Sequence, residues 1–143
     1  MAALAKIQHF SENTGPNGCG KVKGTTTIYE GAMLGRTTAG YLRPFATGDF
    51  FAGHALQSVD NSAGSDGDKT CVYRRGTYYG TVPVFGSTTI AHVGDKVWTS
   101  SDNHADLTRT DPGTTLTTTD LVGYIHDIDP EGNVVIKFIA RDN

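Results

Sequence analysis

Short stretches of β-branched and aromatic residues alternate with turn residues along most of the chain. Val, Ile, Thr, Tyr and Phe favour extended backbone, whereas Gly, Pro, Asn and Asp favour the tight turns that join strands. No window of a dozen residues carries the i, i+3, i+4, i+7 apolar spacing of an amphipathic helix. The pattern therefore predicts an all-β fold with strands at residues 25–29, 32–34, 41–43, 50–59, 70–75, 77–84, 95–99, 121–128 and 133–139.

Proline and glycine mark where the predicted strands end or lie at an edge. Pro44 and Pro83 lack the backbone N–H that a central strand needs, so Pro44 either ends its strand or places it at an edge, and Pro83 suggests an edge position. The Asp-Pro-Glu-Gly segment at residues 129–132 is typical of a hairpin turn between the last two strands. Short strands separated by such turns are typical of a small β-barrel or a β-sandwich, jelly-roll arrangements included, and both architectures fit the pattern.

The first 24 residues differ in composition from the rest. They contain SENTGPNGCGKVKG, which is rich in Gly, Asn, Pro and Lys and offers few apolar side chains for burial. A segment that cannot bury apolar surface does not offset the entropy lost on folding. We therefore predict an extended N-terminal arm over residues 1–24 and a β domain over residues 25–143.

Composition and charge narrow the class of protein. The chain has 143 residues, enough for one domain with a modest core. Its formal net charge is −3 and its basic residues are scattered, so we expect no nucleic-acid partner. No run of about 18 apolar residues occurs, and the start of the chain lacks the apolar core of a signal peptide, so we expect no membrane contact and synthesis in the cytoplasm. Thiols stay reduced there, which disfavours a disulfide between Cys19 and Cys71.

One segment resembles a phosphate-binding loop. Residues 15–21, GPNGCGK, match G-x-x-x-x-G-K, but Val22 stands where Ser or Thr must hold Mg²⁺. The flanking sequence also lacks the buried strand and the helix that such a loop joins. We therefore assign these residues to the arm and predict no nucleotide site.

The histidines and acidic residues lack the spacing of a metal site. No two histidines stand three or four residues apart, and H-E-x-x-H is absent. His126, Asp127 and Asp129 form a site only if the fold assembles one. The polar segment 60–69 carries oxygen ligands that calcium prefers, but not at EF-hand spacing, and turn formation explains its Asp, Asn and Gly content. We predict no metal and no cofactor.

Catalytic motifs are also missing. The G-x-S-x-G elbow that positions a nucleophilic serine is absent, and the acidic residues concentrate in turns, so we predict that the protein is not an enzyme. Its aromatic residues suggest contacts instead. Tyr78, Tyr79 and Trp98 are candidates for contacts between subunits, and such rings also stack on sugars or bases. Consecutive residues of a strand face opposite sides, so Tyr78 and Tyr79 cannot share one surface.

Four segments in a fixed order carry a family likeness. They are TIYEGAMLGRTTAGYLRP, GDFFAGHALQSVDNSAGSDGDKTCVYRRGTYY, HVGDKVWTSSDN and LVGYIHDIDPEGNVVIKF, and they lie between about residues 25 and 138. Together they resemble the capsid cement, or head decoration, proteins of tailed bacteriophages. These are small β-rich proteins that bind the outside of an icosahedral shell.

The resemblance implies a virion structural protein. Such a protein clamps the outer surface of the phage head and stabilises it by bridging major capsid subunits. Family members act as trimers or dimers, with the trimer slightly favoured here, and often reach the major capsid protein with a flexible N-terminal arm. The predicted capsid-binding residues are therefore Ile7, His9, Phe10, Lys21 and Lys23.

Two other classes fit the same residues. One is another virion β module, such as a tail or baseplate part or a jelly-roll shell subunit. The other is a carbohydrate-binding adhesion module built on Tyr78, Tyr79 or Trp98. Location on the virion separates the first class from capsid cement, and glycan binding separates the second.

Overall fold

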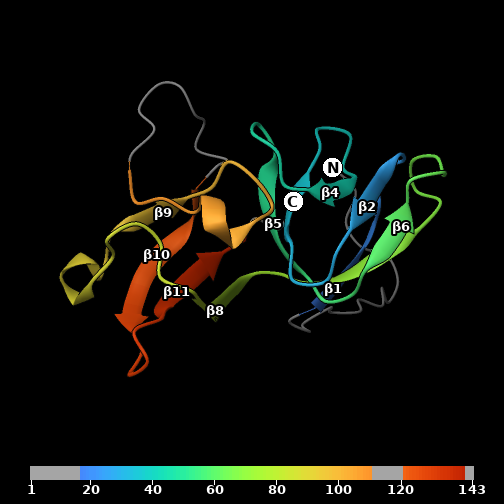
Figure 1. Ribbon diagram of the computed structural model, residues 1–143. Coiled ribbons are helices and arrows are strands. Elements are labelled where there is room, and N and C mark those ends of the chain that lie inside the picture. The colour runs from blue at the N-terminus through green and yellow to red at the C-terminus, as the bar shows by residue number, and fades with distance from the viewer. Residues whose placement is uncertain (1–16, 111–120, 141–143) are drawn as a thin grey trace, which may run out of the picture.

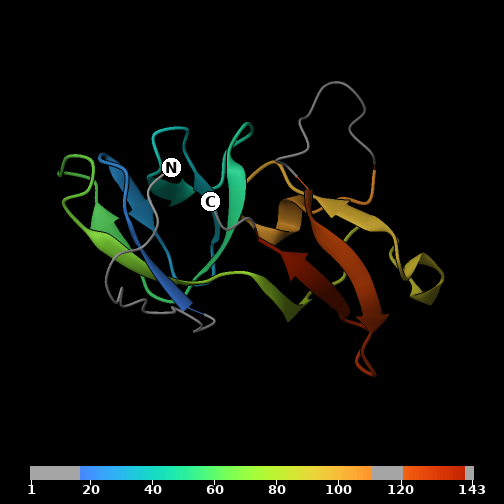
Figure 2. The same cartoon turned by 180° about the vertical axis from the view of Figure 1, so that it is seen from behind.

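The computed structural model describes residues 17–110 and 121–140, which form three sheets and two short 3₁₀ helices (Figures 1 and 2). The strands pair antiparallel with their neighbours in each sheet. The predicted all-β fold is therefore confirmed. The five-stranded sheet contains β1 (Asn17–Lys21), β7 (Thr70–Arg74), β5 (Phe50–Ala55), β3 (Met33–Arg36) and β4 (Leu42–Pro44), in that order.

Two smaller sheets and two 3₁₀ helices complete the described fold. The four-stranded sheet has the order β8 (Thr77–Val82), β11 (Val134–Ile139), β10 (Leu121–Ile128) and β9 (Lys96–Trp98). The two-stranded sheet pairs β2 (Thr26–Ile28) with β6 (Val59–Asn61). The 3₁₀ helices are η1 (Ile90–His92) and η2 (His104–Asp106). In Figure 1 the five-stranded sheet separates the four-stranded sheet from the β2–β6 pair.

Strands β3 and β5 of the five-stranded sheet are buried on both faces. Each contains three consecutive buried residues, at positions 33–35 and 51–53, and neighbours on a strand point to opposite sides. Met33 and Phe51 belong to the core shared with the four-stranded sheet, whereas Leu34 and Ala52 belong to a second core. An isolated β-bridge pairs Val22, the residue that follows β1, with Leu42 of β4, which lies at the opposite edge of the sheet. The sheet therefore curls around the second core: Val22, Ile28, Leu34, Leu42, Ala52, Ala55, Val59, Cys71 and Tyr73.

The structure corrects the predicted arm. Residues 17–21 form β1, which pairs with β7 along its whole length, so they belong to the sheet. The glycines that suggested flexibility allow close packing instead. A Cβ at Gly18 would lie 2.8 Å from the Tyr73 ring, and one at Gly20 would lie 2.5 Å from the Leu42 side chain. The part of the predicted arm at residues 1–16 lies outside the described residues.

The predicted turns and edges are confirmed. β4, which contains Pro44, and β8, which ends just before Pro83, are both edge strands. In the 129–132 hairpin the Asp129 carboxylate accepts a hydrogen bond from the Asn133 N–H (2.8 Å), and Gly132 has φ 89°. In the polar segment 60–69, side-chain bonds make the turns. Asp60, Asp66 and Asp68 accept hydrogen bonds from the backbone N–H groups of Ser62, Gly24 and Ser65, respectively.

Candidate functional site

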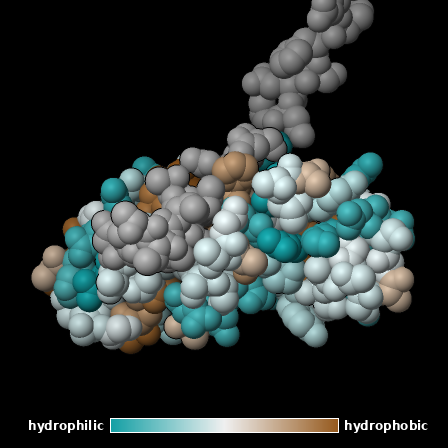
Figure 3. Space-filling model, turned by 90° about the horizontal axis from the view of Figure 1, so that it is seen from above, coloured by the Kyte–Doolittle hydropathy of each residue, from teal (hydrophilic) through white to brown (hydrophobic). Residues whose placement is uncertain are grey.

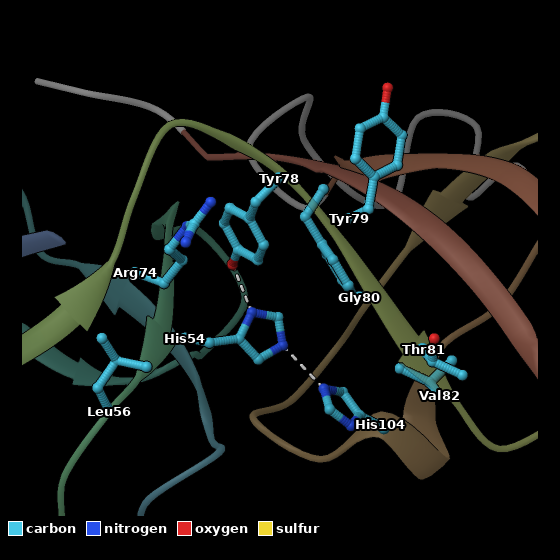
Figure 4. Close-up of a pocket in the computed structure, with 10 residues that line it drawn as sticks. His54, Leu56, Arg74, Tyr78, Tyr79, Gly80, Thr81, Val82 and His104 are labelled. Carbon is cyan, nitrogen blue, oxygen red and sulfur yellow. Dashed lines mark hydrogen bonds between the residues drawn. The ribbon is translucent and has the colours of Figure 1, made fainter. Parts of the chain in front are cut away.

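A groove of about 330 Å³ runs beside strand β8. Its lining includes five consecutive residues of that strand, at positions 78–82 (Figure 4). The remaining walls come from β5 and the residue after it, the end of β7, η2 and β11. These other lining residues are His54, Leu56, Arg74, His104 and Phe138.

The strand leaves one of its edges facing this groove. β8 is the last strand of its sheet and pairs with β11 on one side only, among the residues that the structure describes. Gly80 lies at its middle, and a Cβ there would meet the Phe138 ring at 2.8 Å. The missing side chain therefore lets the ring lie against the strand. The result is a groove with an open strand edge and an apolar floor.

His54 links the two sheets through the wall of the groove. Its Nδ1 contacts the Tyr78 hydroxyl, and its Nε2 lies 2.8 Å from Nε2 of His104 (Figure 4). Burial, and secondarily the nearby His104, lower the pKa of His54 to about 3. Burial also lowers the pKa of His104 and raises that of Tyr78. At neutral pH all three groups are therefore uncharged, and each imidazole carries one N–H.

Aromatic packing holds this cluster in place. The Tyr78 and Phe138 rings stack with their centroids 5.4 Å apart, and His54 meets Phe138 edge-on at 4.6 Å. Phe51 also meets the His54 ring edge-on, with ring centroids 5.9 Å apart. Both nitrogens of His54 are engaged, so neither is available to take a proton from a substrate. The arrangement suits a rigid wall of a binding groove better than an active site.

Arg74 supplies a cationic group to the groove. Its guanidinium lies 5.3 Å from the Tyr78 ring centroid, a cation–π distance. Its Nε is buried and has no hydrogen-bond partner in the part of the chain that the structure describes. A buried N–H without an acceptor is costly, and a carboxylate is the acceptor that fits a guanidinium best. Arg74 therefore adds a positive charge to a groove whose floor is apolar.

The opposite face of the four-stranded sheet has a different character. Tyr79 is 58% exposed, whereas Tyr78 is 8% exposed, which confirms that the two point to opposite sides. The Tyr79 ring lies 4.6 Å from that of His126, centroid to centroid. Other exposed apolar residues are Tyr29, Leu56, Val84, Ile90, Val93 and Ile139. On the face seen from above, brown groups are interspersed with white and teal residues (Figure 3). Tyr79 is therefore the accessible member of the predicted aromatic set.

The structure places the predicted contact residues in different environments. Tyr78 and Trp98 are buried within the chain, so they have little surface left for a second subunit. Lys21 is exposed at the end of β1, and Lys23 is half-buried just beyond it. Ile7, His9 and Phe10 lie outside the described residues.

Three of the groove residues were missed from the sequence, whereas Tyr78 and Tyr79, which also line the groove, were predicted as contact residues. His54, Arg74 and His104 are far apart along the chain and share no local motif. Only the pairing of β5 with β7, which sets His54 opposite Arg74, brings two of them together. An alternation of buried and exposed positions predicts which face a side chain takes, but not which other strand it meets.

Within residues 17–110 and 121–140, no cluster of three or more His, Cys, Asp or Glu side chains has the arrangement of a metal site. Cys19 is exposed and Cys71 is buried, and both are free thiols. The described residues contain no helix with the length and hydrophobicity needed to cross a membrane. Comparison with protein-family models, with curated proteins and with solved structures finds no match to this chain.

Proposed function

We propose that the protein is a capsid cement protein that binds the outer surface of a bacteriophage head. Support comes from the ordered likeness of four sequence segments to head decoration proteins. In the structure these segments contain most of the residues of strands β2 to β11. A small β domain with scattered basic residues is better suited to binding a protein shell than to binding a nucleic acid.

The observation that carries the proposal is how the chain enters the domain. β1 is an edge strand, and each of its five residues pairs with a residue of β7. A segment that precedes it is therefore tied directly to a sheet. Tension on that segment acts along the strand and is shared by several backbone hydrogen bonds at once. This is a suitable anchor for an arm that fastens the domain to a capsid subunit.

The arm and the domain have separate roles in this proposal. An arm that adds a strand to the shell protein gains affinity from main-chain hydrogen bonds. The domain, as a symmetric trimer or dimer, then bridges neighbouring subunits. Several attachments must break together before the shell opens. A head with the protein bound therefore withstands a higher temperature than a single contact would allow.

A binding assay with purified heads tests the proposal. The full chain is mixed with expanded heads of the parent phage, and co-sedimentation and the temperature of DNA release are measured. We expect binding and a higher release temperature. Failure to bind any head form of that phage would refute the proposal.

A truncation tests the role of the arm separately. The variant should begin at Asn17, because removal of β1 would open the five-stranded sheet. We expect about tenfold or greater loss of head affinity with an unchanged circular dichroism spectrum. A matched control replaces residues 1–16 with a Gly/Ser segment of equal length. Equal head affinity of the full chain, the truncated variant and the Gly/Ser control would show that the arm does not attach the domain to the head.

One observation favours carbohydrate binding as a second candidate. The exposed Tyr79 ring beside His126 offers an aromatic surface of the kind that stacks on sugar rings. Trp98, which is buried, does not contribute to it. A glycan array with the native protein and a Tyr79→Ala variant tests this candidate. Glycan binding that is lost in the variant would favour adhesion over capsid cement.

A further inference from the structure

The two histidines of the groove present ring nitrogens to each other. Nε2 of His54, on β5, lies 2.8 Å from Nε2 of His104, on η2 (Figure 4). An uncharged imidazole has one N–H and one lone pair, so at this distance one ring donates a proton and the other accepts it. A divalent metal ion takes the place of such a proton when both lone pairs turn toward it. The two residues stand 50 positions apart, so no spacing along the chain reveals this pair.

The separation of the two nitrogens is close to the one that a metal ion requires. Zinc binds imidazole nitrogen at about 2.0–2.1 Å in tetrahedral geometry, which places two such nitrogens about 3.3–3.4 Å apart. The contact between His54 and His104 is about 0.5 Å shorter than this. η2 is a single 3₁₀ turn without buried residues, so a shift of this size disturbs neither core. His104 also borders a second cavity, of about 530 Å³, which gives its ring room to turn.

The other nitrogen of His54 is held in the way that a metal ligand needs. Its Nδ1 contacts the Tyr78 hydroxyl, and the Tyr78 ring is fixed by stacking on Phe138. When Nδ1 carries the proton and donates it to this oxygen, the lone pair of the ring lies on Nε2, toward His104. Metal-binding histidines commonly make such a hydrogen bond, because it sets both the tautomer and the orientation of the ring. The Tyr78 hydroxyl therefore supports His54 as a ligand.

The groove gives a metal ion access to the pair. Both histidines line it, and each is only half-buried. Arg74 is the one charged residue among the lining residues, and its positive charge weakens the binding of a cation without removing a ligand. Two imidazoles are fewer than the protein ligands of a typical zinc site, so water from the groove fills the remaining positions. We therefore expect weaker binding than at a closed structural zinc site.

We propose that His54 and His104 bind one divalent transition-metal ion between their Nε2 atoms, and that zinc fits this site. Imidazole is a ligand that zinc prefers, and zinc accepts water in open positions. Each ring then keeps its single N–H at Nδ1, so binding at neutral pH releases no net proton. The ion joins β5 to the η2 turn. This inference goes beyond the proposed function and does not depend on binding to a head.

Calorimetric titration of the full chain with zinc chloride at neutral pH tests the proposal. We expect saturable binding, and a loss of affinity of about tenfold or more in a His104→Gln variant, since even the loss of an outer-shell partner has this effect. His104 lies on a surface turn, so the variant should keep the native circular dichroism spectrum. His126→Gln changes an exposed histidine outside the groove and is the matched control, which should bind zinc as the native chain does. Absence of zinc binding, or equal affinity of the native and His104→Gln proteins, would overturn the proposal.

Two further variants separate the parts of the site. Tyr78→Phe keeps the aromatic ring but removes the hydroxyl that supports His54, so zinc affinity should fall about tenfold. Arg74→Gln removes the opposing charge and no ligand, so it should bind zinc at least as tightly as the native chain. Unchanged affinity in Tyr78→Phe, or weaker binding in Arg74→Gln, would contradict the assigned arrangement.

Nuclear magnetic resonance identifies the ligands directly. Long-range proton–nitrogen correlation spectra of the histidine rings report which nitrogen carries the proton in each ring. Zinc should shift the Nε2 resonances of His54 and His104 and leave both rings protonated at Nδ1, while His126 stays unchanged. A purely structural role of the pair predicts no such change. Zinc that binds without altering these two rings would refute the site, whatever the outcome of the head-binding assay.

Discussion

Acid should destabilise the protein through His54. The pKa of this imidazole is lowered from 6.5 to about 3 in the folded protein, chiefly by burial. Below pH 6.5 the unfolded chain therefore binds a proton that the folded protein excludes. This contribution to stability is fully present above the unfolded pKa and is lost as the pH falls toward the folded pKa. Each pH unit within that window costs about 1.4 kcal/mol for one such group.

The size of the effect follows from these two values. Between about pH 7 and about pH 4.5, protonation of His54 in the unfolded chain removes about 2.5 kcal/mol from the free energy of unfolding. His104, whose pKa is also lowered by burial, adds to the loss in the same direction. A loss of this size is a large fraction of the stability of a typical small domain.

The comparison with a His54→Asn variant isolates this contribution. Asparagine does not titrate, and its amide is placed to keep the hydrogen bond with the Tyr78 hydroxyl. The variant loses ring contacts with Phe51 and Phe138, so we expect it to be about 1–3 kcal/mol less stable at neutral pH. Its further loss on acidification should be about 2.5 kcal/mol smaller than that of the native protein.

Urea unfolding followed by tryptophan fluorescence measures both quantities. Trp98 is the only tryptophan and is buried, so its emission reports the loss of the core. Carboxylates that titrate in this range affect both proteins alike and cancel in the comparison. Equal acid losses in the native and His54→Asn proteins would refute the reasoning.

Three further predictions concern the rest of the fold. Arg43→Gln should lower the free energy of unfolding by about 2–4 kcal/mol, because it leaves the buried Asp49 carboxylate without its bidentate partner; a change in thermal midpoint within error would contradict this. Gly53→Ala should prevent normal folding, since its φ is 138° and a Cβ would lie 1.8 Å from a carbonyl oxygen of β7; a soluble variant with native stability would contradict this. A thiol reagent should label Cys19 in the native protein and Cys71 only after unfolding, because Cys71 is buried and burial raises its pKa to about 11; rapid labelling of both would contradict this.

The local pattern predicted much of the secondary structure. The strand at Leu121–Ile128 was predicted with the bounds that the structure has, and the hairpin that follows it was also correct. The predicted strand at residues 50–59 divides into β5 and β6, because exposed residues 56–58 separate two different sheets. Apolar character alone did not reveal that break. Strand positions depend on neighbours in the sequence, so local signals suffice for most of them.

The error at β1 shows where composition misleads. A segment rich in glycine and asparagine was predicted to be an arm, because it has little apolar surface of its own to bury. In the structure its glycines allow Tyr73 and Leu42 to pack close to the strand. The apolar surface that β1 covers belongs to other strands. No property of residues 17–21 alone could have predicted this.

The sequence by itself determined the all-β class, the turns, the edge positions at Pro44 and Pro83, and the opposite facing of Tyr78 and Tyr79. Each of these depends on backbone preferences and on the two-residue period of a strand, which are local properties. The tertiary structure alone decided that strands β3 and β5 are buried on both faces and that a groove forms beside β8. These features depend on which strands pair across long separations in the sequence, and that choice is made by the packing of the whole core.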